Sequence, residues 1–533
     1  MKVSLLWALT LCLSFSAAAQ NRFAQKFAKQ INPKYAKKHL SILASDKFEG
    51  RETGKPGAEM AANYIAAEFK KLGLTAPVNG SYFQNIDLVQ SSLQAKTFSV
   101  NEVPLIYGKD FYFSGAPPAT SINVSEIVFI GFGINSENYD DLKETDITGK
   151  LVMFINKGEP VKNGISAVTK TTQLSEWSTS RVKKIQYIQS KKPLAILAVN
   201  PDVAGILEKN GAYFTSSSGR LTLKSDKNSS SNQNAPVINI APSIAEAFLK
   251  NSGQTYQSLK NAIDTESKPQ TQSLKTVVNA TFGQTHQDVK SVNVLGFLEG
   301  TDLKNEIIVI SAHYDHIGLT ASGNDKVNNG ADDDGSGTTG VLAIARAYSK
   351  AKKAGKGPRR SILFLTVSGE EKGLLGSEWY ADHPVFPLSN TITDLNIDMI
   401  GRVGTEYKSN PDSLNYCYLI GSDKLSTDLH RISEEANATY TKLKIDYKFN
   451  DPNDPERIYY RSDHYNFAKN GIPIIFYFNG VHDDYHAPGD EVNKINFPLL
   501  VKRAQLVYYT SWELANREKR PLVDIKNDMP ASR

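Results

Sequence analysis

The segment Gly330 to Gly337 contains three adjacent aspartates, Asp332 to Asp334. Neighbouring carboxylates repel one another, and taken alone such a triplet is typical of a solvated turn. Here it lies between a predicted strand that ends in His313-Tyr314-Asp315-His316 and a predicted helix that begins near Ser336. Because a bound cation lets like charges share one site, this placement favours a metal site.

Other histidines and carboxylates follow predicted strands at the point where each strand ends. Ile307–Ala312 is followed by His313 and Asp315, Ile362–Val367 by Glu370 and Glu371, Leu395–Ile397 by Asp398, and Ile472–Phe478 by His482 to His486. In a parallel sheet, ligands bind at the carboxyl ends of the strands, so we expect these side chains to meet at one edge. Histidine and carboxylate together suit zinc, and suit neither a thiolate site nor an all-oxygen calcium site.

A pair of metals about 3.5–4 Å apart needs a bridging carboxylate and about two further ligands for each metal. The adjacent pair Glu370 and Glu371 predicts one metal ligand and one free base, because neighbouring side chains point in different directions. A free carboxylate beside a metal-bound water can accept its proton.

The elements that would position these residues predict an α/β fold. Apolar strands are expected at Val292–Leu298, Ile307–Ala312, Ile362–Val367, Leu395–Ile397, Tyr416–Ile420 and Ile472–Phe478, with helices between them, notably Thr338–Lys352. Strands that are apolar throughout and alternate with helices indicate a largely parallel central sheet flanked by helices. Pro33–Leu74 is expected to be helical, interrupted by a turn-rich loop over Gly50–Gly57.

The chain of 533 residues is long enough for two or three domains. Short strands with polar connections predict a smaller β-rich domain inserted over 121–259, followed by a polar stretch over Thr265–Thr285. The parts expected are therefore a signal peptide over 1–19, an N-terminal part of the main domain over 20–120, the insertion over 121–259, the catalytic domain over 260–520 and a C-terminal tail over 521–533.

The first residues predict export. Lys2 precedes an apolar run, and Ala17-Ala18-Ala19 is a small-residue cleavage site, so cleavage after Ala19 is expected. The run is shorter than a membrane span, and no stable membrane insertion is expected after cleavage. Cys417 would then be the single cysteine, and an exported chain without an internal disulfide indicates a bacterial periplasm or cell exterior.

The overall composition is that of a globular protein, with 40% hydrophobic and 22% charged residues. The net charge of +5 is spread over scattered lysines. No basic stripe with interleaved aromatic residues stands out, which argues against a nucleic-acid partner.

The five motifs together resemble a known family. They are His313-Tyr314-Asp315, Gly330 to Gly337, Ser368-Gly369-Glu370-Glu371, Asn396 to Gly401 and Tyr485-His486. They match, in order, the co-catalytic di-zinc aminopeptidases of the bacterial leucyl aminopeptidase and glutamate carboxypeptidase II type. The resemblance covers about Pro33 to Phe113 and Val292 to Leu514.

The resemblance implies a role for each matching position. His313 and Asp398 would bind one zinc, Glu371 and His486 a second zinc, and Asp333 both. Glu370 would be the general base and acid, Asp315 the carboxylate that orients His313, and Tyr485 a stabiliser of the oxyanion. These roles imply an exported exopeptidase, an aminopeptidase acting on peptides, in which a water held by two zinc ions loses its proton to Glu370.

The insertion resembles a protease-associated domain, on the basis of Val128 to Gly133 and Gly149 to Val152. Two alternatives to the aminopeptidase remain open. A glutaminyl cyclase has the same fold and performs acyl transfer with one zinc, and a binding protein can carry the fold without activity. Metal content per chain and a chelator-sensitive peptidase assay distinguish them.

Three further histidines lie near the motifs, and we interpret them as structural residues or as residues that support the metal ligands without binding the metal: His316, His464 and His482. Gly335 to Gly340 matches a dinucleotide fingerprint formally, but the three preceding carboxylates would repel a pyrophosphate. The triplet lacks the alternating ligands of an EF-hand loop.

Overall fold

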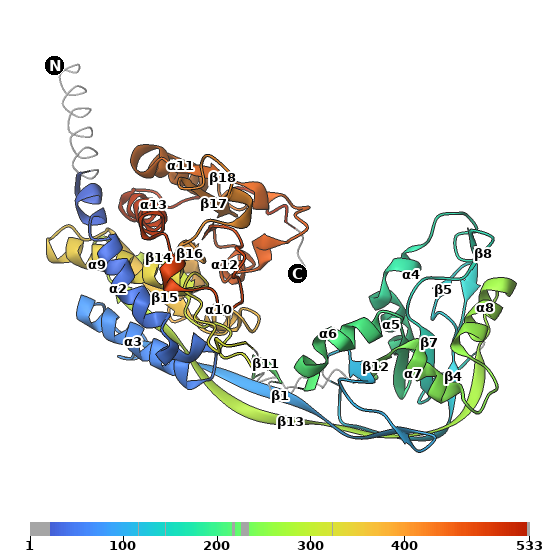
Figure 1. The fold of residues 1–533 in the computed structure, drawn as a ribbon. Helices are drawn as coiled ribbons and strands as arrows, with labels where there is room; N and C mark the ends of the chain where they lie inside the picture. Colours follow the sequence, from blue (N-terminus) through green and yellow to red (C-terminus); the bar gives the residue numbers. More distant parts are fainter. Residues whose placement is uncertain are drawn as a thin grey trace. The chain divides into compact units, whose positions relative to one another are not determined.

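The computed structural model describes residues 22–115, 117–143, 145–215, 219–224, 234–321 and 323–529. It divides into two compact units, one formed by Met1–Leu88 with Val289–Arg533 and the other by Val89–Asp288 (Figure 1). The predicted signal peptide lies outside the described residues. Within the described ranges, no helix is long and apolar enough to cross a membrane.

A mixed sheet forms the centre of the first unit. Its strand order is β18 (Lys444–Asp446), β17 (Tyr416–Ile420), β19 (Ile474–Phe478), β16 (Thr391–Ile397), β14 (Leu303–His313), β15 (Arg360–Val367) and β13 (Gln272–Leu298). The four inner strands β19, β16, β14 and β15 are parallel to one another, whereas β17 pairs antiparallel with β19 and β13 with β15. This confirms the predicted α/β class with a largely parallel sheet, and it brings four strand ends to one edge.

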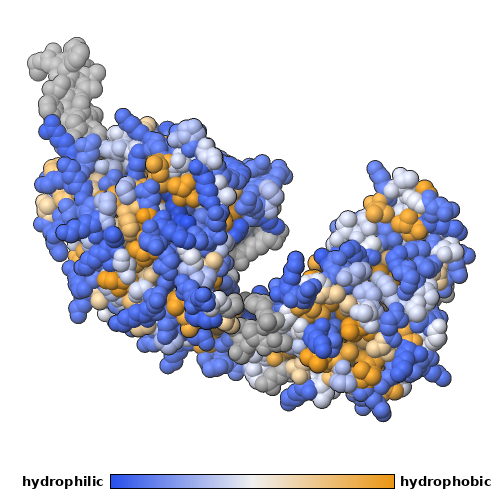
Figure 2. All heavy atoms as spheres, viewed as in Figure 1, coloured by the Kyte–Doolittle hydropathy of each residue, from blue (hydrophilic) through white to orange (hydrophobic). Residues whose placement is uncertain are grey.

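Helices cover both faces of this sheet. On one face α9 (Gly335–Lys353) packs against α2 (Pro33–Leu43), α3 (Pro56–Leu72) and α13 (Phe497–Asn516), and their apolar residues form the largest core. On the other face lie α10 (Leu375–Asp382) and the short α12 (His464–Ala468), which contact each other. Hydrophilic residues cover most of the visible surface of this unit, with apolar residues in small groups (Figure 2). The apolar strands and helix faces predicted from the sequence are therefore buried.

The second unit has its own sheet and core. The parallel strands β4 (Thr120–Phe129), β7 (Leu151–Ile155), β10 (Ala195–Val199) and β12 (Val237–Ile240) follow one another, and β3 (Phe111–Phe113) pairs antiparallel with β12. Helices accompany them, among them α5 (Arg181–Ser190), α7 (Pro242–Leu249) and α8 (Tyr256–Glu266). The unit expected to be β-rich thus alternates strands with helices.

The expected bounds of the insertion, 121–259, differ from those of the second unit, 89–288. Two long strands, β1 (Phe83–Val100) and β13, cross these boundaries. The polar stretch over 265–285, to which no element was assigned, contains the end of α8 at Glu266 and the start of β13 at Gln272. Every second residue of β13 from Leu274 to Phe282 is buried, an alternation of period two that its polar composition concealed.

Candidate metal centre

Five loops at the carboxyl edge of the first unit's sheet supply the predicted site residues. His313 is the last residue of β14, Glu370 and Glu371 follow β15, Asp398 follows β16, and His486 lies in the loop after β19. Asp333 lies two residues before α9. The parallel register of the inner strands brings these loops together, as the strand-end argument predicted.

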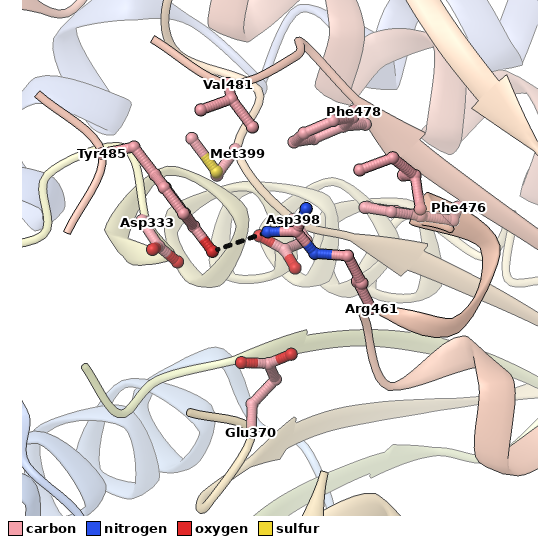
Figure 3. A pocket seen from close by; sticks show the side chains of 10 residues that line it. Asp333, Glu370, Asp398, Met399, Arg461, Phe476, Phe478, Val481 and Tyr485 are labelled. Carbon is pink, nitrogen blue, oxygen red and sulfur yellow. Dashed lines mark hydrogen bonds between the residues drawn. The ribbon is translucent and has the colours of Figure 1, made fainter. Parts of the chain in front are cut away.

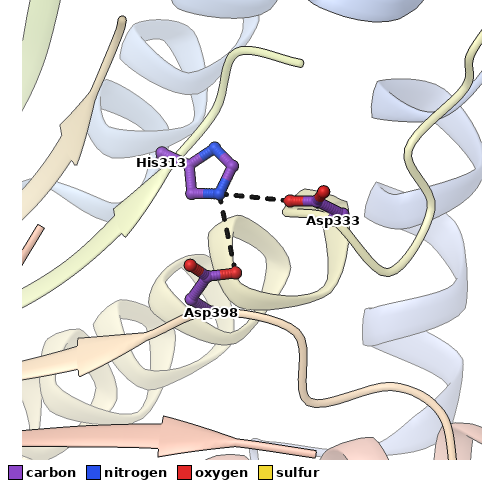
Figure 4. A group of neighbouring side chains, drawn as sticks. All are labelled: His313, Asp333 and Asp398. Atoms are coloured by element: carbon purple, nitrogen blue, oxygen red, sulfur yellow. Dashed lines mark ion pairs between the residues drawn. The ribbon is translucent and has the colours of Figure 1, made fainter. Parts of the chain in front are cut away.

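His313, Asp333 and Asp398 form one group (Figure 4). The Nε2 atom of His313 lies 3.3 Å from Asp333 Oδ1 and 3.5 Å from Asp398 Oδ1. The other ring nitrogen, Nδ1, bonds to the backbone carbonyl of Asp315 at 3.0 Å. A carbonyl can only accept, so Nδ1 carries a proton, and Nε2 is the ring nitrogen that faces the two carboxylates.

A second group surrounds Glu371. His486 Nε2 lies 3.0 Å from Glu371 Oε2 and 3.2 Å from Asp333 Oδ2. His316 Nδ1 lies 2.8 Å from Glu371 Oε1 and 3.7 Å from Asp333 Oδ2. The two oxygens of Asp333 therefore face different groups, one toward His313 and one toward His316 and His486.

Strong charge interactions mark this cluster. Burial opposes protonation of His313, yet the nearby Asp398 and Glu370 carboxylates raise its pKa well above the ordinary value. Burial likewise opposes ionisation of Asp333, but His316, His313 and His486 hold its pKa well below the usual range. Burial raises the pKa of Glu370 well above its usual range, and Glu371 and Asp398 add to this. A divalent cation would stabilise the ionised form of these buried carboxylates, which lie close to one another and to the imidazoles.

The donor set fits zinc. His313 Nε2, Asp333 Oδ2 and Glu371 Oε1 are buried, and among the described residues they face only the other imidazoles and carboxylates of the cluster without completing a well-aligned hydrogen bond. A buried polar atom without a partner is costly, and a metal ion satisfies it. Imidazole nitrogens and carboxylate oxygens are ligands that zinc prefers.

Hydrogen bonds hold the acidic triplet in place. Asp334 Oδ1 accepts from the backbone N–H of Gly337 and of Met399, which makes it the N-cap of α9. Asp332 Oδ1 accepts from the Gly401 N–H at 2.6 Å. Asp332 and Asp334 thus support the loop, and Asp333 is left to face the two groups.

Asp315 lies beside His313, but its carboxylate makes other contacts than the one expected. The distance from His313 Nδ1 to Asp315 Oδ1 is 3.8 Å, which is too long for a hydrogen bond. Asp315 Oδ2 instead accepts from Thr53 Oγ1 at 2.7 Å, and Oδ1 accepts from the Glu370 N–H at 3.3 Å. Through its carboxylate, Asp315 positions Glu370 rather than the imidazole ring.

A pocket opens beside the cluster (Figure 3). Its lining comprises Asp333, Glu370, Asp398, Met399, Ile458, Arg461, Phe476, Phe478, Val481 and Tyr485. Arg461 Nη2 donates to the Tyr485 hydroxyl oxygen at 3.3 Å, so the hydroxyl hydrogen remains free to point into the pocket. Glu370 lies across the pocket from this pair, with Oε2 4.0 Å from His313 Nε2.

Four residues at or beside the site were missed by the sequence reasoning or set aside as structural or supporting. They are Arg51, His316, Arg461 and Asp490. Only His316 could have been found from its position in the chain, because it follows closely after β14, the strand that ends at His313. The others come from loops with no local pattern, and their contacts join residues far apart in the chain.

Comparison with known proteins agrees with the geometry. Residues 293–511 match the model of peptidase family M28. This segment of the chain belongs to peptidase family M28. It contains every M28 motif position named above, from His313 to His486, together with the inner strands of the first unit's sheet.

Curated relatives match this chain over part of their length. Aminopeptidase YwaD of Bacillus subtilis is 27% identical over 275 residues, 50% of this chain and 52% of the relative. A protein of Arthroderma otae named probable leucine aminopeptidase is 31% identical over 216 residues, 39% of this chain and 54% of the relative. The chain therefore spans about half the length of these relatives.

Solved structures share the fold of this chain. An aminopeptidase from Aneurinibacillus sp. strain AM-1 superposes with a TM-score of 0.53 at 18% identity, covering 95% of this chain and 99% of that one. A zinc aminopeptidase from Bacillus subtilis gives a TM-score of 0.51 at 19% identity, covering 93% and 99%. At these identities the likeness establishes the fold alone.

Proposed function

We propose that this protein is an exported zinc-dependent exopeptidase, an aminopeptidase that removes N-terminal residues from peptides with two zinc ions per chain. One observation carries the proposal. The oxygens of Asp333 face two separate groups, at 3.3 Å from His313 and at 3.2 Å from His486, as a carboxylate shared by two metals must. The family and the names of the relatives support the peptidase class.

The zinc ligands are those expected from the resemblance. His313 and Asp398 would hold one zinc, Glu371 and His486 the other, and Asp333 both. When bound, zinc supplies Lewis acidity and lowers the pKa of a bound water.

Glu370 has the position and environment of a general base and acid. It lines the pocket, and its Oε2 lies 4.0 Å from His313 Nε2, farther than Asp398 Oδ1 at 3.5 Å. Because it is not paired closely with an imidazole, its carboxylate is free to exchange protons. Burial raises the pKa of Glu370, and a carboxylate with a raised pKa is a better acceptor for a proton from water and can then donate that proton to the leaving amine.

Tyr485 would stabilise the developing oxyanion. Its hydroxyl oxygen is occupied by Arg461, which leaves its hydrogen to donate into the pocket. The apolar wall of Phe476, Phe478 and Val481 offers a surface for the side chain of the substrate's first residue.

The decisive test combines metal content and turnover. Mature zinc-loaded protein is assayed on a panel of aminoacyl and dipeptide substrates, and Glu370→Gln is compared with the control Glu378→Gln, a half-exposed glutamate of α10. We expect two zinc ions per chain in all three proteins and a fall in turnover of about 10²–10⁴-fold for Glu370→Gln alone. Near-normal turnover in that variant contradicts the mechanism, and one zinc per chain favours the cyclase.

Export is tested separately. Expression of the full chain in a bacterium, followed by N-terminal sequencing of the periplasmic and secreted fractions, should give a chain that begins at Gln20. Recovery of the chain with Met1 in the cytoplasm contradicts export. The protease-associated domain proposed over 121–259 lies within the second unit, 89–288, and if it is separate from the metal centre, deleting that unit should leave zinc binding by the first unit intact.

A further inference from the structure

His316 lies within the metal centre although it belongs to no motif of the resemblance. It stands three residues beyond His313 and is fully buried. Its Nδ1 atom lies 2.8 Å from Glu371 Oε1 and 3.7 Å from Asp333 Oδ2. These are two of the residues proposed to hold the second zinc, and the three side chains form a compact group of possible metal ligands.

The His316 ring is held in this position by its surroundings. Its backbone N–H donates to the Arg51 carbonyl, and its ring meets that of His486 edge-on, with 5.7 Å between centroids. The Gly330 backbone lies against the ring so closely that a β-carbon there would come 2.5 Å from His316 Cδ2. This close approach leaves the ring little freedom to turn away from Glu371.

The hydrogen bonding of His316 does not account for its burial. Among the described residues, Nε2 has no hydrogen-bond partner, and within hydrogen-bond distance Nδ1 faces only Glu371 Oε1, at 2.8 Å. An imidazole buried without partners costs free energy, whereas a metal ligand does not need a hydrogen bond at the ligating nitrogen. The position of Glu371 also indicates that both histidines belong to one metal site, because one of its oxygens faces His316 and the other faces His486.

We propose that His316 is a further protein ligand of the metal held by Glu371 and His486. The inference rests on the proposed function, in which this centre binds two zinc ions. The second metal would then have four protein ligands: His316, Glu371, His486 and Asp333. The first would have three: His313, Asp398 and Asp333.

This difference makes the two metal positions chemically unequal. Zinc sites with four protein ligands are closed, whereas sites with three keep a position for water or substrate. The open position would therefore belong to the metal at His313, which is also the histidine nearest Glu370. The closed position would fill first and hold its zinc more tightly.

The experiment counts histidine ligands directly. X-ray absorption at the zinc edge of the fully loaded wild-type chain should give about 1.5 imidazole nitrogens per zinc, since three histidines would serve two metals. His316→Gln should lower this to about 1.0, and competition with a chromophoric chelator should show the tighter zinc weakened by at least about 100-fold. His430→Gln, a half-buried histidine that pairs with Ser422, is the matched control and should change neither value.

The outcomes separate this inference from the proposed function. A wild-type chain with two zinc ions and about 1.0 imidazole per zinc overturns the ligand role, whether or not His316→Gln weakens binding. An imidazole count that His316→Gln leaves unchanged also overturns it. Because the wild-type measurement stands by itself, a variant that fails to fold does not remove the test. A wild-type chain that binds fewer than two zinc ions overturns the proposed function as well.

Discussion

The carboxylate of Asp490 accepts a hydrogen bond from the backbone N–H of Asp333, at 3.1 Å. The same oxygen, Oδ2, accepts a second bond from the Asp332 N–H at 2.9 Å, and Asp490 is fully buried. A buried carboxylate from a loop 157 residues further along the chain therefore fixes the backbone that carries the proposed bridging residue.

Replacing Asp490 should weaken metal binding without removing a ligand. In Asp490→Ala the two N–H groups lose their acceptor and the loop of Asp333 becomes less ordered, so we expect zinc affinity to fall about 10–100-fold. Competition with a chromophoric chelator measures this. Asp483→Ala is the control, because that side chain is 66% exposed and pairs with Lys408 on the surface. Equal affinities in the two variants would contradict the positioning role.

Arg51 should contribute strongly to the stability of the first unit. Its guanidinium is buried and donates to the backbone carbonyls of Leu43, Tyr314, Asn329 and Gly330, at 2.7–2.8 Å. Arg51→Met leaves four buried acceptors unsatisfied, and we expect the free energy of unfolding to fall by at least about 3 kcal/mol. Urea unfolding measures it, with the exposed Arg431→Met as control. A loss no larger than that of the control would mean that water replaces the guanidinium.

Tyr485 should act on turnover rather than on substrate binding. Tyr485→Phe removes the hydroxyl that would donate to the oxyanion, so we expect kcat to fall about 10²-fold while KM changes by less than about threefold. Steady-state kinetics on an aminoacyl substrate measure both, and Tyr447→Phe, which removes a hydroxyl bonded to Glu434, is the control. A rise in KM with kcat unchanged would assign Tyr485 to substrate binding instead.

Local patterns made much of this centre predictable from the sequence. Apolar strands that end in histidine or carboxylate place their last residues at one edge of a parallel sheet, which is why His313, Glu371 and Asp398 meet. The N-cap role of Asp334 was not predicted, because the helix was expected to begin near Ser336 and begins at Gly335.

The contacts that complete the centre could not be predicted in the same way. Arg51 and Tyr314 are 263 residues apart, and an isolated arginine in a turn-rich loop indicates a surface residue until its burial is known. His316 was interpreted as a structural or supporting residue because proximity in the chain does not reveal where a side chain points. The part of β13 before the predicted strand Val292–Leu298 was missed because polar residues such as Lys275 and Asn279 fill most of its exposed positions.

Asp315 provides the sharpest test of which contacts position the catalytic groups. The His313 ring is oriented by the backbone carbonyl of residue 315, at 3.0 Å, and a substitution leaves that carbonyl in place. The Asp315 carboxylate accepts from Thr53 and from the Glu370 N–H. In Asp315→Asn one acceptor oxygen becomes a donor, so Glu370 is held less well.

We therefore expect Asp315→Asn to reduce turnover by at least about tenfold while zinc affinity changes by less than about tenfold. Thr53→Val, which removes a donor to the same carboxylate, should reduce turnover in the same direction and by less. Chelator competition and kinetics on one preparation of each variant give both quantities. If zinc affinity falls as far as turnover, the carboxylate acts through His313 and not through Glu370. A large effect on turnover alone would establish that the two carboxylates, 55 residues apart, work as a positioned pair.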